Sequence, residues 1–361
     1  MPARRLGLLV VALLTLALTA APVARPDAAQ AACAPNAIYV PSCGAWQGTW
    51  PGVQTLSQWE ATVGRKADIY REFKLFDSYN DPSESFPGPA ADAAIAGGRM
   101  YYFSWRPEET VGATVYRSWA DIASGKYDAT FVNPTADKIK AWGQSHGGKK
   151  IFFTFHHEPE NSRGTPAEYV AAWRHIYNVF TARGARPYLI FTWVMSGFQT
   201  RPNQWGALYP GDAYVDWLGY DPYARVCVHH VTTPPPKFTT TFGESAGTDV
   251  DDTGKYRFYK WATGAGAVDS EDHQTYRKPG SFTKPIMAAE YGAYYGTDYP
   301  TAMEKFFKDM KASLSAGGYP QIKAFIYYQA RSCSRVDSTA GTKAAFQDLL
   351  QISRLKQPKP Y

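Results

Sequence analysis

Two short stretches of the chain change from apolar to charged residues within a few positions. In residues 149–160, KKIFFTFHHEPE, an apolar run leads directly to His157, Glu158 and Glu160. In residues 284–292, KPIMAAEYG, a second apolar run leads to Glu290. Ionised carboxylates are costly to bury without a partner, so carboxylates placed directly after buried runs indicate a functional site.

Two carboxyl groups that face each other across a sugar ring can cleave a glycosidic bond. One stays protonated and donates its proton to the leaving oxygen, while the other is ionised and attacks carbon or activates water. Mutual repulsion holds the two pKa values apart. We therefore predict that Glu158 and Glu290 form a catalytic pair. Glu160 is an alternative acid, helix capping or ion pairing is the alternative for either glutamate, and a structural role is the alternative for His157.

The elements that would position these residues follow from recurring apolar runs. Seven runs predict buried strands, and an eighth, first strand is expected near residues 44–48; the runs cover residues 68–73, 99–105, 150–155, 188–194, 214–220, 285–289 and 322–328. Helical patterns lie between them. The clearest begins with a capping box at Thr165 and ends at Gly184. Two others cover residues 303–314 and 343–352.

Alternating strands and helices predict an α/β fold with a parallel sheet, and eight such units close a (β/α)8 barrel. An open doubly wound sheet is the alternative architecture, but no Gly-x-Gly-x-x-Gly turn follows any strand. The carboxyl ends of all strands of a barrel meet at one rim, where active sites lie. Glu158 would end the fourth strand and Glu290 the seventh, so both are expected at that rim.

Aromatic residues make up 15% of the chain, which contains 11 Trp and 25 Tyr. Most must belong to the core, but rings near strand ends can stack on sugars. We expect Trp105 and Trp193 to line a substrate groove and Trp217 to lie in the core. The irregular region 224–254 is expected to form a wall or lid of the cleft, or else a disordered insertion.

The first thirty residues resemble a secretory leader. Arg4 and Arg5 precede an apolar run over residues 6–21, and residues 29–31, Ala-Gln-Ala, suit a cleavage site. We therefore expect a signal peptide at residues 1–31 and one catalytic domain at residues 32–361, in a secreted, monomeric protein without a membrane span. An N-terminal membrane anchor is the alternative. The formal net charge of +6 is mild and scattered, which argues against a nucleic-acid partner.

Four cysteines follow the leader, and export favours disulfides. Of the three possible pairings we favour Cys33 with Cys43 and Cys227 with Cys333. A zinc site is the weaker alternative because no C-x-x-C pair is present. Residues 156–158 also make a poor metal site, because adjacent strand residues point to opposite faces. We expect neither a metal nor an organic cofactor.

These segments together resemble glycoside hydrolase family 26, a family of (β/α)8 retaining glycosidases. FFTFHHEPE resembles its His-Glu acid/base segment, which implies that Glu158 is the general acid/base and that His157 lies in the subsite of the cleaved sugar. KPIMAAEYG resembles the nucleophile strand, which implies Glu290. YVDWLGYDPY, residues 214–223, resembles the sixth strand, with Asp221 in its Asp-x-Tyr and Tyr223 hydrogen-bonded to the nucleophile.

The departures from the family pattern concern the substrate. Family mannanases usually carry a His near the end of strand three, where this chain has Trp105-Arg106-Pro107, and Trp-Arg near the end of strand eight, where it has Tyr327-Tyr328-Gln329. Tyr328 is expected to stack on the sugar.

The resemblance implies a secreted endo-β-glycosidase that acts on a polysaccharide. The first expected substrate is β-1,4-mannan, and β-1,3-xylan or mixed-linkage β-glucan are the alternatives. A non-catalytic carbohydrate-binding protein on the same barrel is the other class.

Overall fold

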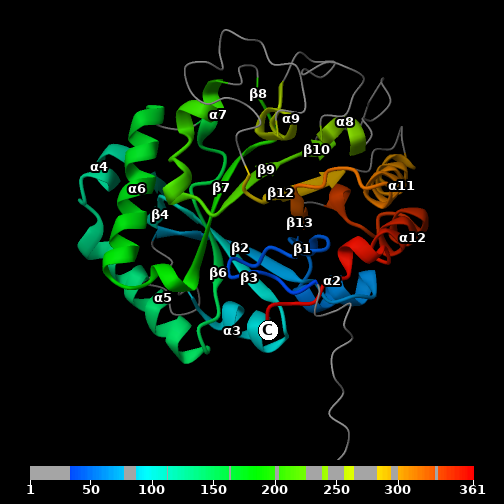
Figure 1. Cartoon of the computed structure of the whole chain (residues 1–361), viewed down its shortest axis with the longest axis horizontal. Coiled ribbons are helices and arrows are strands. Elements are labelled where there is room, and N and C mark those ends of the chain that lie inside the picture. Colours follow the sequence, from blue (N-terminus) through cyan, green and yellow to red (C-terminus); the bar gives the residue numbers. More distant parts are fainter. Residues whose placement is uncertain are drawn as a thin grey trace, which may run out of the picture.

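Eight parallel strands form a closed ring in the computed structural model, with helices outside it (Figure 1). The structure describes residues 33–76, 87–111, 113–161, 164–199, 203–224, 238–242, 256–263, 283–293, 300–329 and 332–361. The barrel strands are β1 (Trp46–Trp50), β2 (Ile69–Leu75), β3 (Met100–Arg106), β6 (Ile151–Phe155), β7 (Leu189–Ser196), β9 (Trp217–Asp221), β12 (Ile286–Ala293) and β13 (Ile322–Tyr328). Pairing of β12 with β9 closes the ring, which confirms the predicted (β/α)8 barrel.

The described helices are α2 (Leu56–Val63), α3 (Pro89–Ala96), α4 (Trp119–Ala123), α5 (Asn133–Ser145), α6 (Pro166–Ala182), α7 (Asn203–Leu208), α8 (Phe238–Phe242), α9 (Phe258–Thr263), α11 (Ala302–Ser315) and α12 (Ala340–Leu349). The predicted capping box is present at the start of α6: the Thr165 hydroxyl accepts from the Glu168 backbone, and the Glu168 carboxylate accepts from the Thr165 backbone. None of the helices in the described ranges is long and apolar enough to cross a membrane.

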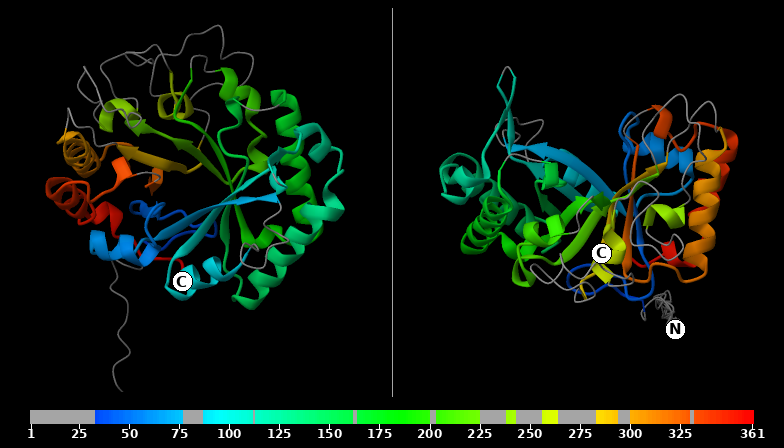
Figure 2. Two further views of the ribbon diagram at one scale, coloured as in Figure 1. Left: turned by 180° about the vertical axis from the view of Figure 1, so that it is seen from behind. Right: turned by 90° about the horizontal axis from the view of Figure 1, so that it is seen from above.

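Five short strands of the described chain extend the loops at the carboxyl ends of the barrel strands. β4 (Glu108–Val111) and β5 (Ala113–Tyr116) form an antiparallel hairpin directly after β3. β8 (Phe198–Gln199) pairs with β11 (Tyr256–Arg257). β10 (Tyr223–Ala224) continues β9 after Pro222 and pairs with the end of β12. The β4–β5 hairpin projects beyond the barrel (Figure 2, right).

Strand residues alternate between two apolar layers, as a period of two requires. Phe152 of β6 packs inside the barrel together with inward residues of the other strands, among them Trp46, Ile69, Met100, Val194 and Trp217. Phe153 and Phe155 pack outward against the helices. This inward layer of described residues fills the interior of the barrel, which leaves the rim as the place for a ligand. Trp217 lies in this core, as predicted.

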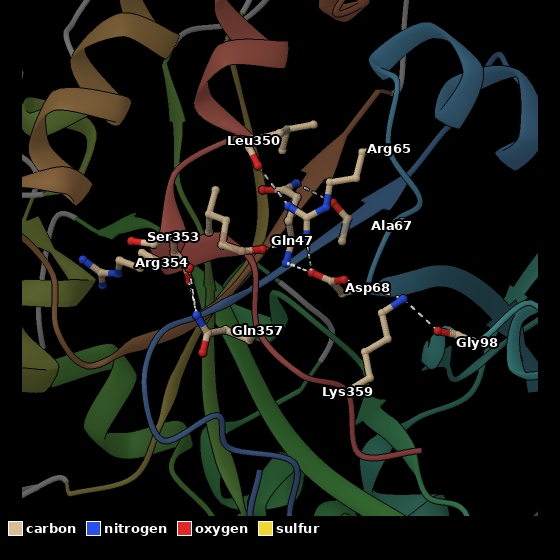
Figure 3. Close-up of polar contacts among 12 residues, drawn as sticks. Gln47, Arg65, Ala67, Asp68, Gly98, Leu350, Ser353, Arg354, Gln357 and Lys359 are labelled. Carbon is tan, nitrogen blue, oxygen red and sulfur yellow. Dashed lines mark hydrogen bonds and ion pairs between the residues drawn. The ribbon is translucent and has the colours of Figure 1, made fainter. Parts of the chain in front are cut away.

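A polar network closes the opposite, amino-terminal end of the barrel (Figure 3). The buried Asp68 carboxylate accepts from the Gln47 backbone N–H at 2.9 Å and from Arg65 at 2.8 Å, and lies 3.7 Å from the Lys359 ammonium. Arg65 also donates to the carbonyls of Leu350 and Leu355. Through Arg65 and Lys359, Asp68 thereby holds the segment that follows α12 against the amino-terminal end of the barrel.

Replacing Asp68 with alanine should lower the free energy of unfolding by about 2–4 kcal/mol, because it strands the Arg65 and Lys359 charges and a backbone N–H. Burial raises the pKa of Asp68 despite the opposing charge of Arg65, so the neutral Asp68→Asn should cost less. Urea unfolding of both variants measures the difference. A loss below about 1 kcal/mol for Asp68→Ala would show that the network does not fasten the C-terminal segment.

Of the two disulfides in the favoured pairing, the described residues contain one complete disulfide and one cysteine of the other. Cys33 and Cys43 are joined by a disulfide. Cys333 is also disulfide-bonded, whereas its expected partner Cys227 lies outside the described residues. The leader 1–31 and most of the region 224–254 also lie outside them, so their expected roles stay predictions.

Candidate active site

A bulge in β12 turns Glu290 toward the barrel axis. Ala289 belongs to the inward layer and Ala288 to the outward layer, so strict alternation would send Glu290 outward. The register between β12 and β13 shifts between Ala288 and Tyr291, and Tyr291 packs outward instead. β-bulges re-aim side chains in this way. Glu290 is therefore directed inward at the rim, where it is 6% exposed.

Two residues with a left-handed backbone conformation redirect the side chains at the end of β6. His156 has φ 44° and Glu158 has φ 50°, a backbone conformation that costs a non-glycine residue about 1–2 kcal/mol. The His156 ring turns outward, where its Nδ1 accepts from Trp119 Nε1 of α4 at 2.9 Å. His157 points into the rim instead, with Nε2 3.9 Å from Glu290 Oε1. Strain of this kind gathers at functional sites.

Arg71 of β2 holds the Glu290 carboxylate from inside the barrel. Its side chain is fully buried, and its Nη2 lies 3.1 Å from Glu290 Oε1 and 2.9 Å from Ser104 Oγ. Nη1 donates to the Ala289 carbonyl. The guanidinium also lies over the ring of Phe73, 4.6 Å from its centroid. Sequence reasoning missed Arg71, although a charged residue at an inward position of an apolar strand was the signal for it.

Tyr223 contacts Glu290, and Asp221 lies near Arg71. The Tyr223 hydroxyl donates to Glu290 Oε2, which is the hydrogen bond that the family resemblance implied. Asp221 is buried, and its Oδ1 is 4.0 Å from Arg71 Nη1. Neither Asp221 oxygen has a hydrogen-bond partner among the described residues. Burial and the negative charges of Glu290 and Glu158 raise the pKa of Asp221 well above its usual value.

The two glutamates differ in their surroundings in the way that acid/base and nucleophile roles require. Burial and the negative charges of Glu290 and Glu160 raise the pKa of Glu158 to about 8. Burial also raises the pKa of Glu290, but the Arg71 charge and the Tyr223 hydrogen bond oppose that rise. Glu290 therefore ionises first and Glu158 keeps its proton at neutral pH. One protonated and one ionised carboxyl group is the arrangement with which a pair of carboxyl groups can cleave a glycosidic bond.

His157 is a neutral ring beside the pair. Burial and the positive charges of Arg71 and Arg106 hold its pKa well below 6.5. Its Nδ1 is buried with no hydrogen-bond partner in the part of the chain that the structure describes. A neutral imidazole with an unsatisfied nitrogen suits a sugar hydroxyl. A group of His, Cys, Asp or Glu side chains that could hold a metal ion is absent from the described residues.

Half-buried rings form one side of the rim. Tyr328, at the end of β13, stacks on Trp50, at the end of β1, with ring centroids 4.5 Å apart. Phe73 contacts both of these rings edge-on and also lies 5.1 Å from the His157 ring. The Tyr223 ring is 6.0 Å from Tyr328. The expected ring at Tyr328 is thus part of a larger aromatic surface, and sequence reasoning missed Trp50 and Phe73.

The structure contradicts the predicted groove positions of Trp105 and Trp193. Trp105 is 2% exposed and packs outward against Phe76 and Phe180. Trp193 is fully buried and donates from Nε1 to the Leu208 carbonyl at 3.1 Å. Both sit on the outward face of their strands, where the helices cover them. They are core residues.

Glu160, the alternative acid, is occupied elsewhere. Its Oε1 accepts from the backbone N–H of Ser196 at 2.6 Å, from the Ser196 hydroxyl at 2.8 Å and from Trp205 Nε1 at 3.2 Å. These contacts join the segment after β6 to the end of β7 and to α7. Through Oε1, Glu160 therefore supports the loop that carries Glu158.

Comparison with known proteins supports the same family. Residues 129–240 match the model of glycosyl hydrolase family 26, which confirms the resemblance of the segments that carry Glu158 and Tyr223; the segment that carries Glu290 lies outside this match. Endoglucanase H of Acetivibrio thermocellus is 32% identical over 194 residues, which are 50% of this chain and 19% of that protein. The chain thus spans about a fifth of that relative's length.

Solved structures share the fold. A ruminal endo-β-1,4-mannanase of family 26 superposes over 86% of this chain and 64% of its own, with 16% identity and a TM-score of 0.52. A family 26 β-mannanase from Bacteroides ovatus covers 87% of this chain and 90% of its own, with 14% identity and a TM-score of 0.57. At these identities the likeness concerns the barrel alone.

Proposed function

From the premise that residues 129–240 match glycosyl hydrolase family 26, we propose that this protein is a glycoside hydrolase that cleaves a β-linked polysaccharide with Glu158 and Glu290. One observation carries the proposal: Arg71 and Tyr223 hold Glu290, and the charge of Glu290 helps to raise the pKa of Glu158 to about 8. An acid that keeps its proton beside an ionised carboxylate is what glycosidic cleavage requires.

The reaction proceeds in two displacements. Glu158 donates its proton to the glycosidic oxygen while the Glu290 carboxylate attacks the anomeric carbon, so the C–O bond breaks and a glycosyl ester forms. The ester carries no charge, so the repulsion that raised the pKa of Glu158 disappears. Glu158 then serves as the base that deprotonates water, which attacks the anomeric carbon and releases Glu290. The configuration of the sugar is retained.

β-1,4-Mannan is the first substrate that we propose, with endo cleavage, because the structural neighbours include two mannanases. A β-glucan is the second candidate, because the relative with 32% identity is described as an endoglucanase. β-1,3-Xylan is the third, from the family resemblance. Tyr328 and Trp50 would stack on the sugar, with His157 and Asp221 on its polar edge.

A reducing-sugar assay on galactomannan, glucomannan, lichenan, β-1,3-xylan and cellulose tests the proposal. We expect release from at least one of them, and none from the Glu290→Ala variant. Wild-type protein that binds an oligosaccharide in isothermal titration but releases no sugar would instead be a carbohydrate-binding protein on the same barrel.

We also propose that residues 1–31 are removed on secretion, that residues 32–361 form one catalytic domain and that it acts as a monomer. The disulfide between Cys33 and Cys43, directly after the expected leader, supports an oxidising destination. Amino-terminal sequencing of the secreted protein tests the cleavage, and sedimentation tests the monomer.

A further inference from the structure

Arg106 is the last residue of β3 and therefore stands at the carboxyl-terminal rim of the barrel. Along β3, Met100 and Tyr102 point inward and Ser104 reaches the inward Arg71, so alternation places Arg106 on the inward face at the rim. Its positive charge lowers the pKa values of His157, Glu158 and Glu290. The guanidinium therefore lies within electrostatic reach of the whole candidate site.

A buried carboxylate holds Arg106 in place. Arg106 Nη2 lies 2.7 Å from Glu108 Oε1, and the Glu108 side chain is 5% exposed while that of Arg106 is 40% exposed. Glu108 is the first residue of β4, and the Arg117 backbone N–H donates to the Pro107 carbonyl at 2.8 Å across the base of the β4–β5 hairpin. The hairpin thus positions Glu108, and the Glu108 carboxylate forms a close ion pair with one arm of the guanidinium.

The remaining donors of Arg106 are not used by the described residues. Nε is buried without a hydrogen-bond partner among them, and Glu108 is the ion-pair partner that the structure gives. A guanidinium carries five N–H donors in a rigid fork. The Arg106 guanidinium is paired with a buried carboxylate and has spare donors near the proposed catalytic pair. It is therefore organised to bind a ligand.

We propose that Arg106 is a substrate-binding residue, that it donates hydrogen bonds to hydroxyl groups of an uncharged sugar next to the cleaved bond, and that Glu108 is its positioning residue. This inference rests on the proposed function. It also gives a role to one departure from the family pattern, because Arg106 stands near the end of strand three, where mannanases usually have His.

The charges around the opening favour an uncharged sugar. Arg71 is matched by Glu290, and Arg106 is matched by Glu108. Each of these cations therefore already has a carboxylate partner. An acidic sugar would meet no unmatched cation there and would be repelled by Glu290. Hydroxyl groups can share a guanidinium that is already paired, since they need only its free N–H groups.

The test measures binding separately from cleavage. Isothermal titration with neutral manno- and mixed-linkage gluco-oligosaccharides, on proteins that all carry Glu290→Ala, compares Arg106 with Arg106→Ala. We expect affinity to fall about 10- to 100-fold, the size of a lost hydrogen bond to a charged donor. Arg183→Ala is the matched control, because Arg183 is 37% exposed and paired with Asp137 on the outside of the barrel; its affinity should not change.

Since Arg106→Ala leaves Glu108 buried without its partner, a second variant guards against loss of fold. Arg106→Met combined with Glu108→Gln removes both charges and should lose affinity to the same extent, while Glu108→Gln alone should lose less. Unchanged affinity in the double variant would overturn the inference, even if the wild-type enzyme cleaves the same glycan. In a Glu158→Gln protein, which keeps Glu290 as the partner of Arg71, tighter binding of oligogalacturonate than of neutral oligosaccharides would also overturn it. A wild-type protein that binds but cleaves nothing would contradict only the proposed function.

Discussion

Glu290→Gln should lower kcat on the polysaccharide by a factor on the order of 10,000 or more, the scale seen when a unit of covalent catalysis is removed. Glutamine keeps the shape of the side chain but cannot form the glycosyl ester. The fold should survive, because the substitution removes one partner of Arg71 while the Ala289 carbonyl and Ser104 still accept from that guanidinium. Initial rates and circular dichroism measure the two effects.

The same variant has a second, electrostatic consequence. The negative charge of Glu290 helps to raise the pKa of Glu158, so its removal should lower the pKa of Glu158 below the value of about 8. Carboxyl titration followed by NMR measures that change. A pKa of Glu158 that stays near 8 in Glu290→Gln would show that burial and the charge of Glu160 set it without Glu290, and Glu158 and Glu290 would then not be coupled.

Glu72→Gln is the matched control for Glu290→Gln. Glu72 lies on β2 beside Arg71 but on the opposite face, where its carboxylate accepts from the hydroxyls of Tyr70 and Tyr101. Its loss removes a partly buried carboxylate without touching the rim. Activity close to wild type in Glu72→Gln together with loss in Glu290→Gln would assign the effect to the site. Activity retained by Glu290→Gln on every β-glycan tested would refute the proposed nucleophile.

The barrel was predictable because each strand is a continuous apolar run covered on both faces. The last run, residues 322–328, coincides with β13, and the others agree with their strands to within a few residues. The largest differences lie at carboxyl ends such as that of β12, which continues to Ala293 beyond the expected end at residue 289. There the apolar pattern stops because the rim is polar, although the backbone pairing continues.

Which rings reach the site could not be inferred from closeness to strand ends alone. Trp105 and Trp193 lie near the ends of β3 and β7, yet both point outward, while Val194 beside Trp193 lies on the inward face. Alternation places Arg106, beside Trp105, on the inward face as well. Strict alternation of inward and outward residues along each strand would have predicted this difference between neighbours. The same rule fails at Glu290 and His157, where a bulge and a left-handed residue invert it. Such local breaks depend on tertiary contacts, which the pattern of residue types does not contain.

Glu158→Gln should lower kcat/KM on the polysaccharide by about 100- to 10,000-fold, the range of general acid catalysis. The loss should be much smaller on an aryl glycoside whose leaving group departs without a proton. In that substrate Glu290 attacks as before, so the first displacement needs no acid. Comparing the two substrates separates proton donation from binding, because loss of a binding contact would affect both alike.

The pH profile provides the sharper test of the same residue. Glu158 must be protonated to act, and its pKa is raised to about 8, so wild-type activity should persist through neutral pH and fall as the pH rises through about 8. Glu290 must be ionised, so activity should also fall on the acid side, as its carboxylate takes up a proton. On the aryl glycoside, Glu158→Gln should keep the acid limb of the pH profile and lose the basic limb.

A basic limb that persists near pH 8 in Glu158→Gln would mean that another group donates the proton. Glu160 would then be the first to examine, since burial raises its pKa as well and only its contacts with Ser196 and Trp205 argue for a supporting role.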